Sequence, residues 1–423
     1  MSKVIPSFKH FTKSLGPGLI TGIADDDPSG IATYAQTGAV FGLQQVWLAL
    51  YSIPFMVVIQ EMCGRIGIIT GRGLASIIKS HYSRSVLYFS IFLLLLANTI
   101  NIGADLGAMA ESLRLITPLS IGVGLLLLTA FTIFSTVIIP YKTYVKVLKW
   151  LALTVGAYII AALCVHQAWG AVFQALLTPH IEWSKEYILN ITAMLGTTIS
   201  PYLFFWQTSE EVEEEVEHKK LRFFGRGVPK VTKHDLKEMR SDTIVGMAIS
   251  NLVAFFIIIT ASSTLHTAGT TGIASAAQMA QALEPFAGSF ATILFALGIL
   301  GTGLLAVPVL AGSAGYALAE AFSVQEGLGK KFSQAKGFYA VIIIATLAGA
   351  LVNVLHIDPM AMLYYSAAAN GILAAPLMVI ILLIANNKKI LGNNTNGVVS
   401  NILGWTIVVL MGVVSLFTIW SFF

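Results

Sequence analysis

Charged side chains are scarce in this chain of 423 residues, of which Asp, Glu, Lys and Arg make up only 11%. Soluble domains carry about 25% charged residues, so this chain cannot cover itself with a water-facing surface. Hydrophobic residues reach 56%, and the mean hydropathy is +0.80. No hydrophilic stretch between the apolar runs is long enough for a large soluble domain. A water-soluble enzyme is therefore excluded.

Cysteine is also nearly absent. Cys63 and Cys164 lie in or beside apolar segments and have no His or Cys neighbours. They form neither a disulfide framework nor a zinc site, and two small buried hydrophobic side chains are the simpler interpretation. The segment up to Ser14 has no short apolar core with a cleavage site, so we expect no removable signal peptide. Nothing resembles an ATP-binding motif, which argues against a primary pump.

Long apolar runs dominate the rest of the chain. Runs of about 18 or more apolar residues are typical of membrane-spanning helices. We therefore expect an all-α, polytopic membrane protein with the lipid bilayer as its surroundings. Eleven predicted helices lie near residues 16–42, 46–69, 86–111, 117–140, 145–167, 186–207, 243–264, 288–322, 338–354, 360–386 and 399–422.

The positive charges predict the orientation of these helices. With residues 1–15 in the cytoplasm, all 25 Lys and Arg residues except Arg114 and Lys185 fall on the inner side. Lys and Arg in short loops stay preferentially on the cytoplasmic side. We expect a plasma (inner) membrane protein with a cytoplasmic N-terminus and, because the helix count is odd, an external C-terminus.

One extended hydrophilic segment, residues 208–242, separates the sixth and seventh predicted helices. It begins with six glutamates between Glu210 and Glu217 and becomes basic from Lys219 to Arg240. We expect a cytoplasmic loop that starts as a solvated helix continuing the sixth span and that pairs its charges internally. A cation-sensing role is the alternative.

Two predicted spans contain signals for a broken helix. The first contains Asp-Asp-Asp-Pro-Ser-Gly, in which Pro28 lacks an N–H and Gly30 adds backbone freedom. The sixth contains Pro201 in the middle of an apolar stretch. Interrupted backbone at membrane depth is tolerated only where it is buried in protein or lines a cavity. We expect the first break near Asp27.

The two interrupted spans are each the first of five. Interrupted segments at corresponding positions of two halves are typical of transporters built from inverted repeats. We expect one repeat at residues 16–167 and another at 186–386, followed by an eleventh helix at 399–422. Carbonyls and half-helix ends at such breaks bind ions near the middle of the membrane.

Three consecutive carboxylates, Asp25, Asp26 and Asp27, lie at the first break. One charge at the centre of a bilayer costs at least ~2.5–3.5 kcal/mol, and the span contains no basic residue to offset it. A cation arriving from solution is the natural partner, and we expect Asp27 to bind it. Asp25 and Asp26 could instead face a cytoplasmic vestibule or stay protonated.

An ordered set of motifs resembles the NRAMP (natural resistance-associated macrophage protein) family of proton-coupled importers of manganese, iron and related metals. The motifs are Gly-Pro-Gly-Leu from Gly16, Asp-Pro-Ser-Gly from Asp27, Gln-Glu-Met-Cys-Gly-Arg from Gln60, Gly-Thr-Thr-Ile-Ser-Pro-Tyr from Gly196 and Asn-Lys-Lys-Ile-Leu-Gly from Asn387. The resemblance implies a LeuT-like fold with two inverted five-helix repeats plus an eleventh helix. It also implies transport by alternating access.

Matched position by position, the resemblance implies roles for single residues. Asp27 matches the metal-binding aspartate, and Ala24 and Thr197 match positions that offer backbone carbonyls. Gln60 matches a glutamine near the site. Asp105 matches a helix-three acid associated with the proton route of the family.

The chain departs from the family at two metal ligands. Gly30 stands where the family has a metal-binding asparagine, and Ser200 stands where it has a methionine. Thioether sulfur favours softer metals, whereas hydroxyl, carboxylate and water oxygens suit Mg²⁺, Ca²⁺ or Mn²⁺. Mg²⁺ in particular keeps several waters. We expect an oxygen-only site for a partly hydrated Mg²⁺ or Mn²⁺, with Asp26 and Ser200 beside Asp27, as in the NRAMP-related magnesium transporters, which also lack the methionine.

The family's proton machinery is reduced as well. Tyr202 and Gln207 replace two histidines of helix six, and Asn98 replaces a glutamate of helix three. These departures predict weak or absent coupling to protons, although Asp105 could still relay them. A polar contact of Asp105 with Asn98 or Asn101 at helical spacing is the alternative.

Simple structural roles explain several other polar residues. Glu61 and Arg65 stand four apart and predict an ion pair on one helix. Thr197 and Thr198 could simply bond their own helix backbone. Asn370 lies in the tenth span, close to where the family has a polar residue near the site.

Two further functions stay open beside a hard-ion importer. One is a proton-coupled Mn²⁺/Fe²⁺ importer like typical NRAMP proteins. The other is an organic-substrate carrier of the same fold, in which N–H groups at the first break would bind a substrate carboxylate, although the acidic residues 25–27 would repel it. A receptor that does not transport would leave both breaks unexplained. We expect no enzyme activity, no cofactor and no nucleic-acid partner.

Overall fold

The computed structural model describes residues 16–140, 143, 156–270, 272–273, 275–355 and 357–421, and this part of the chain contains helices and no β-strand. The first helices are α2 (Pro17–Asp25), α3 (Pro28–Phe41), α4 (Trp47–Tyr51), α5 (Ile53–Thr70), α6 (Leu74–His81), α7 (Arg84–Ile116), α8 (Ile121–Ile138), α10 (Ala157–Cys164) and α11 (Trp169–Leu177). They are followed by α12 (Lys185–Thr198), α13 (Pro201–Glu217), α14 (Lys233–Ala261), α15 (Ala276–Gln281), α16 (Glu284–Ala287), α17 (Ala291–Phe322), α18 (Lys336–Val352), α19 (Pro359–Ala385), α20 (Lys388–Leu391) and α21 (Val398–Trp420).

Nine segments among the described residues are helical, long and apolar enough to cross a membrane. The first predicted span is not among them because its two halves, α2 and α3, are each too short. The fifth, expected at 145–167, lies largely outside the described residues, as does the N-terminal segment 1–15. The other nine expected spans each have a helical counterpart, and the chain is a multi-pass membrane protein.

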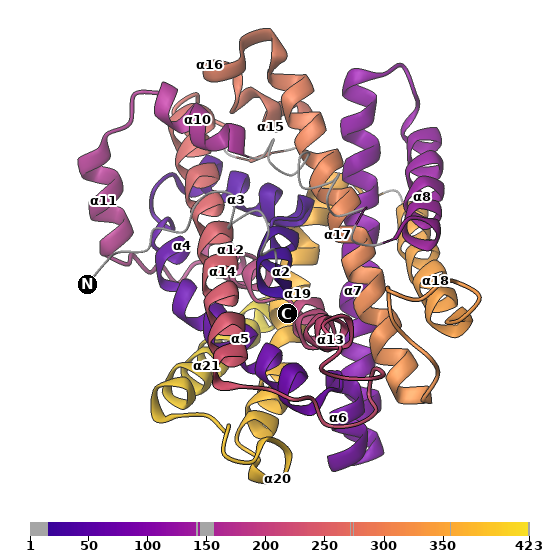
Figure 1. The fold of residues 1–423 in the computed structure, drawn as a ribbon. Helices are drawn as coiled ribbons and strands as arrows, with labels where there is room; N and C mark the ends of the chain where they lie inside the picture. Colours follow the sequence, from indigo (N-terminus) through magenta and orange to yellow (C-terminus); the bar gives the residue numbers. More distant parts are fainter. Residues whose placement is uncertain are drawn as a thin grey trace, which may run out of the picture.

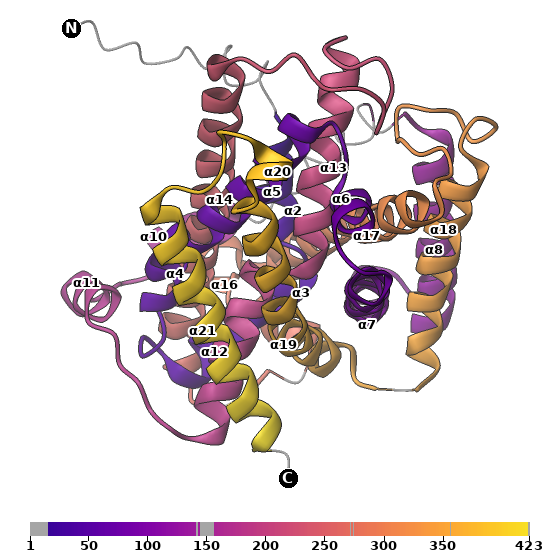
Figure 2. The same ribbon diagram turned by 90° about the horizontal axis from the view of Figure 1, so that it is seen from below.

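The broken helix α2–α3 lies at the centre of the molecule (Figure 1). Helices α7, α12, α14 and α19 pack around it. Helix α18 packs against α7 and α8 on one flank, and α11 lies on the opposite flank (Figure 1). Helix α21 runs along α12 and α19 (Figure 2). The centre of the bundle is therefore enclosed by helices from both halves of the chain.

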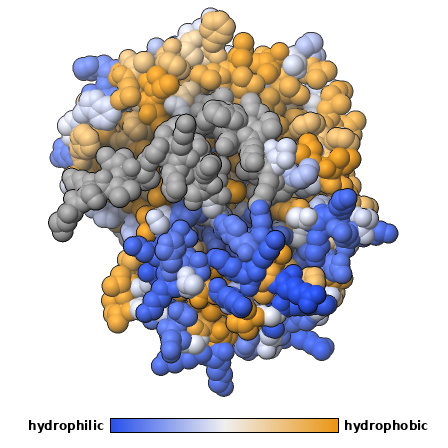
Figure 3. Space-filling view, viewed as in Figure 1, coloured by the Kyte–Doolittle hydropathy of each residue, from blue (hydrophilic) through white to orange (hydrophobic). Residues whose placement is uncertain are grey.

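The two ends of the bundle differ in polarity. Helices α6 and α20, which belong to basic segments of the sequence, lie at the lower end in Figure 1, and α15 and α16 lie at the upper end. On the face shown in Figure 3, hydrophilic residues gather in the lower half and apolar residues in the upper half. This arrangement agrees with basic segments on one side of the membrane. The direction of insertion stays a prediction.

Glycines bring α2 and α14 into backbone contact. A Cβ at Gly22 would lie 2.4 Å from the carbonyl carbon of Gly246, and a Cβ at Gly246 would lie 2.2 Å from the carbonyl oxygen of Gly18. Small residues allow such close approach between membrane helices. At the start of α2, Asp242 of α14 accepts hydrogen bonds from the N–H groups of Gly18 (2.7 Å) and Leu19 (3.1 Å). Packing and capping together fix α2 on α14.

The hydrophilic segment 208–242 is more helical and more buried than expected. Helix α13 extends to Glu217 and α14 begins at Lys233, so only residues 218–232 connect them. Glu211 and Glu215 are each only 2% exposed. The prediction of a solvated helix is therefore wrong for this face of α13, while the continuation of the sixth span as a helix is confirmed.

Donors inside the protein contact these glutamates in part, and a buried charge without partners is costly. Gln207 donates to Glu211 Oε1 at 2.8 Å. Glu213 accepts hydrogen bonds from the hydroxyl of Tyr316 (2.9 Å) and from the N–H of Leu328 (2.8 Å). Lys220 Nζ lies 3.4 Å from Glu215 Oε1, so the internal pairing of charges that we expected is present in part.

The expected ion pair of α5 is confirmed and is part of a larger network. Arg65 Nη2 lies 3.1 Å from Glu61 Oε2. Arg240 of α14 donates to the other carboxylate oxygen of Glu61 at 2.8 Å. Arg65 also donates to Asn396 Oδ1 at 2.6 Å. These contacts join α5 to α14 and to the segment before α21.

Replacing Gly22 by alanine should destabilise the fold. The new methyl group would overlap the backbone of α14, and overpacking costs about 1–3 kcal/mol. The matched control is Gly412→Ala on α21, where a Cβ meets nothing within 4 Å. Thermal melts in detergent should show a clear loss for Gly22→Ala and no loss for the control. Equal melting temperatures would contradict the backbone contact.

Candidate metal site

The first break is built by local sequence. Helix α2 ends at Asp25 and α3 begins at Pro28, whose ring suits the first helical position. Asp27 caps α3, and its Oδ1 atom accepts hydrogen bonds from the N–H of Gly30 (2.7 Å) and the hydroxyl of Ser29 (2.7 Å). An aspartate at this position satisfies N–H groups that the helix itself leaves free. The predicted break near Asp27 is confirmed.

The second oxygen of Asp27 faces α7. Asn101 Nδ2 donates to Asp27 Oδ2 at 2.8 Å, and Asn370 of α19 donates to Asn101 Oδ1 at 3.3 Å. Asp27 is only 2% exposed. Its three hydrogen-bond donors are all neutral, and none of the ion pairs found among the described residues includes it. A buried carboxylate is thus held in place without a counter-charge.

The second break lies between α12, which ends at Thr198, and α13, which begins at Pro201. The Ser200 hydroxyl points back to the last turn of α12, at 2.7 Å from the carbonyl oxygen of Gly196 and 2.9 Å from that of Thr197. Its hydrogen is engaged with these carbonyls, so the oxygen can act toward an ion only through its lone pairs.

The two breaks touch each other. The hydroxyl of Tyr202, on the first turn of α13, donates to the carbonyl oxygen of Ala24 at 2.9 Å. A Cβ at Gly30 would lie 3.0 Å from Thr197 Oγ1 and 3.2 Å from the carbonyl oxygen of Asp25. Segments about 170 residues apart in sequence therefore form one polar centre inside the bundle.

Asp25 and Asp26 face a different neighbour from Asp27. The hydroxyl of Ser250 on α14 lies 2.7 Å from Asp25 Oδ2 and 3.2 Å from Asp26 Oδ1. Asp25 is fully buried and Asp26 is 7% exposed, so in this conformation neither opens onto solvent. Gln60 on α5 is also buried, and neither of its side-chain amide atoms has a hydrogen-bond partner.

Asp105 lies on α7, one turn after Asn101, and is fully buried. The backbone N–H of Ser29 interacts with its carboxylate, and no side chain among the described residues donates to it. The alternative of a contact with Asn98 or Asn101 is wrong, because Asn98 donates to the carbonyl oxygen of Leu310 (2.7 Å) and the hydroxyl of Ser313 (2.8 Å). Asn101 donates to Asp27 instead.

Sequence reasoning missed three contributors to this centre. Ser29 and Asn101 hold the Asp27 carboxylate, and Ser250 bridges the other two aspartates. The available signal was weak. Each is a polar residue in an otherwise apolar span, and many such residues only bond their own helix, as Thr33 does with the carbonyl of Ser29.

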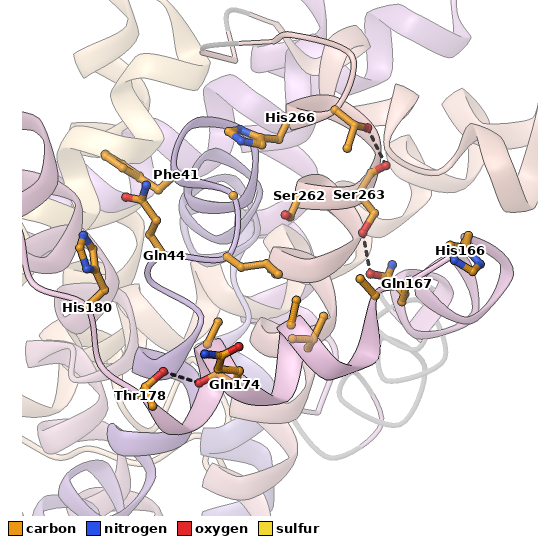
Figure 4. A pocket seen from close by; sticks show the side chains of 17 residues that line it. Phe41, Gln44, His166, Gln167, Gln174, Thr178, His180, Ser262, Ser263 and His266 are labelled. Carbon is orange, nitrogen blue, oxygen red and sulfur yellow. Dashed lines mark hydrogen bonds between the residues drawn. The ribbon is translucent and has the colours of Figure 1, made fainter.

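A cavity with a volume of about 640 Å³ lies away from the two breaks (Figure 4). It is bounded by the Phe41 end of α3, by α11 and by the residues that follow α14. His166, His180 and His266 line it from different sides and do not converge (Figure 4). One ring nitrogen of His266 lies 2.9 Å from the carbonyl oxygen of Ala39. No residue of either break is among the residues that line this cavity.

One compact group of potential metal ligands appears among the described residues, formed by His234, Asp235 and Glu238 near the start of α14. Asp235 already accepts from Thr232 in a capping box and pairs with Lys220 at 3.0 Å. The group is an ordinary helix start outside the apolar bundle.

Two interrupted helices that meet inside a multi-pass helical bundle are the features of the LeuT-like fold, and they confirm the expected fold class. The family model "Natural resistance-associated macrophage protein-like" matches residues 18–421. The chain therefore belongs to the Nramp family of divalent metal transporters and is not an enzyme. The resemblance read from the motifs is confirmed.

Curated relatives and solved structures agree with this assignment. A protein of Klebsiella pneumoniae named "Divalent metal cation transporter MntH" is 27% identical over 294 residues, which is 69% of this chain and 68% of that protein. The crystal structure of the Eremococcus coleocola manganese transporter superposes with a TM-score of 0.79 at 16% identity, over 99% of this chain and 89% of that chain. The structure of Mhp1, a nucleobase-cation-symport-1 family transporter, superposes with a TM-score of 0.59 at 14% identity. The match covers 96% of this chain and 90% of that chain. The structural likenesses show a shared fold.

Replacing Tyr202 by phenylalanine should weaken the contact between the two breaks. The carbonyl of Ala24 would lose its donor, and a buried group without its partner costs about 1–3 kcal/mol. Denaturant titration in detergent should show this loss. The control is Tyr339→Phe, because the Tyr339 hydroxyl donates to the carbonyl of Lys330 in the loop before α18, at a part-buried position, and its loss should matter less. An equal or smaller loss for Tyr202→Phe would contradict the role of this bond.

Proposed function

We propose that this protein imports divalent metal cations by alternating access through the polar centre formed by the two helix breaks. We further propose a preference for hard, partly hydrated ions such as Mg²⁺ or Mn²⁺. The observation that carries the proposal is the Asp27 carboxylate, which is buried at a helix break, has only neutral donors and lies beside the second break. A visiting cation supplies the charge that this carboxylate lacks.

The proposed ligands are oxygen atoms from both breaks and from α5. The carbonyl oxygens of Ala24 and Thr197 each accept one hydrogen bond already, and a second lone pair on each is left for a metal ion or its water. The full set is Asp27, Ala24, Thr197, Ser200, Asp26 and Gln60.

The absence of sulfur from this set supports a hard ion. Ser200 replaces the methionine of typical relatives, and Gly30 removes an asparagine ligand, so direct ligands are fewer. An ion that keeps part of its water shell needs fewer protein ligands, and Mg²⁺ sheds water reluctantly. The names of the relatives, a divalent metal cation transporter and a manganese transporter, support a divalent cation but do not separate Mg²⁺ from Mn²⁺.

We also propose that coupling to protons is weak or absent. Tyr202 and Gln207, which replace two histidines of helix six, donate to Ala24 and Glu211 respectively. A phenol titrates near pH 10 and an amide does not titrate, so neither changes charge near neutral pH. Asp105 is the remaining acid of the family's proton route, and a proton-coupled Mn²⁺/Fe²⁺ importer is the alternative.

The basic segments at one end of the bundle support a plasma-membrane protein with that end in the cytoplasm. These segments include residues 71–84 and 386–397, and Lys and Arg in short loops prefer the cytoplasmic side. In this orientation the N-terminus is cytoplasmic and the C-terminus is external.

Isothermal titration of purified protein with Mg²⁺, Mn²⁺ and Ca²⁺ tests the site. Asp27→Ala should abolish binding, because it removes the carboxylate that caps α3 beside the second break. Asp358→Ala is a matched control: Asp358 also precedes a proline and caps its helix, accepting from the N–H of Ala361 at 2.9 Å, but it is exposed. The control should bind like the native protein.

Two results would refute the metal proposal. One is a native protein that binds none of the three ions. The other is equal binding by Asp27→Ala and Asp358→Ala. If Fe²⁺ or Cd²⁺ is taken up strongly and Mg²⁺ does not compete, the proposal of divalent metal transport stands. The proposed preference for hard ions is then refuted.

Proteoliposomes that contain a pH-sensitive dye test the coupling. A Mn²⁺ gradient should drive metal uptake with little or no acidification of the lumen, because the two histidine positions no longer titrate. A protonophore added at the end provides the full-scale dye response. Robust acidification that follows metal uptake and disappears in Asp105→Asn would establish proton coupling instead.

A further inference from the structure

The space beside Gly30 is occupied by two hydroxyl-bearing side chains. A Cβ at this glycine would lie 3.0 Å from Thr197 Oγ1 and 3.4 Å from Cε2 of Tyr34. The first distance is tighter than ordinary van der Waals contact, so a larger residue fits only if its neighbours move. The chain has therefore not simply lost the asparagine of its relatives at this position. Thr197 and Tyr34 fill the place of that side chain.

Both hydroxyls are buried and have no established partner other than each other. Tyr34 is fully buried and Thr197 is 2% exposed, and the two hydroxyls interact, so a bond between them leaves acceptor lone pairs on both oxygens. Their neighbours differ: Thr198 Oγ1 donates to the carbonyl of Met194 (3.1 Å), and Thr33 Oγ1 donates to that of Ser29 (2.8 Å). Buried hydroxyls are normally bonded, and exceptions call for an explanation.

These two oxygens belong to the centre that holds Asp27. Gly30, which Thr197 and Tyr34 flank, donates its N–H to Asp27 Oδ1 at 2.7 Å. Tyr34 also lies within electrostatic range of the carboxylates of residues 25–27. Water bound to a divalent cation is a strong donor, and a hydroxyl oxygen is an acceptor for it.

We infer that Tyr34 and Thr197 determine ion specificity by accepting hydrogen bonds from water molecules that a divalent cation at Asp27 retains. The inference rests on the proposed function and deepens it. In this arrangement, two hydroxyls that face the water shell replace the direct ligand that an asparagine would provide. Ions that keep their water, such as Mg²⁺, gain more from it than Mn²⁺, which is less demanding in its coordination.

Tyr34→Phe and Thr197→Val each remove one hydroxyl and change the side-chain shape little. Titration of each purified variant with Mg²⁺ should show affinity about tenfold lower, equivalent to about 1.4 kcal/mol. The loss of Mn²⁺ affinity should be smaller, so the Mg²⁺/Mn²⁺ affinity ratio should fall. Thr197→Ser keeps the hydroxyl and should restore Mg²⁺ binding, which a purely structural role of the threonine methyl group would not predict.

Two matched controls separate loss of a hydroxyl from loss of packing. Thr198→Val removes the adjacent hydroxyl, which is bonded within its own helix. Tyr158→Phe removes another buried tyrosine hydroxyl, one that has no partner, on α10. Both controls should bind Mg²⁺ like the native protein, and thermal melts should show that all five variants are folded.

The outcomes distinguish this inference from the proposed function. Suppose that the native protein binds Mg²⁺ and Asp27→Ala does not. If Tyr34→Phe and Thr197→Val then bind Mg²⁺ with native affinity and with the native Mg²⁺/Mn²⁺ affinity ratio, the inference is overturned while the metal site stands. An equal loss for Mg²⁺ and Mn²⁺ also overturns the role in specificity. If the native protein binds neither ion, the proposed function itself fails.

Discussion

A carboxylate without a counter-charge, held inside an apolar bundle, is the constraint on which the rest of this structure depends. Asp27 can occupy that position because the helix stops around it. The break gives it the N–H of Gly30, and neighbouring polar side chains, Ser29 and Asn101, supply the other donors. Neutral donors hold an anion in place without cancelling its charge. The negative charge of Asp27 is therefore still able to attract a cation.

The surrounding packing holds the two breaks next to each other. Helix α2 is fixed on α14 by contact between Gly22 and Gly246, and its first turn is capped by Asp242. The hydroxyl of Tyr202 then joins the end of α2 to the start of α13. Helix α13 continues without interruption from the second break to the buried glutamates at its far end.

The comparison with known proteins illustrates how one architecture serves different cargo. Mhp1, a nucleobase-cation-symport-1 family transporter, shares this fold at 14% identity. Function lies in the side chains placed at the breaks and not in the fold itself. In this chain Gly30, Ser200 and Tyr202 lie at or next to the two breaks.

The sequence by itself determined nine of the membrane-spanning segments and both helix breaks, and it singled out Asp27 as the candidate ligand. These features depend on local chemistry: the length of apolar runs, a proline that lacks an N–H, and an acid where no basic residue is near. Only the tertiary structure decided which side chains meet at the site. Asp27 and Asn101 are 74 residues apart, and Asp25 and Ser250 are 225 apart. Helix packing brings such residues together, and no periodicity in the sequence records which polar residue of one span faces which residue of another.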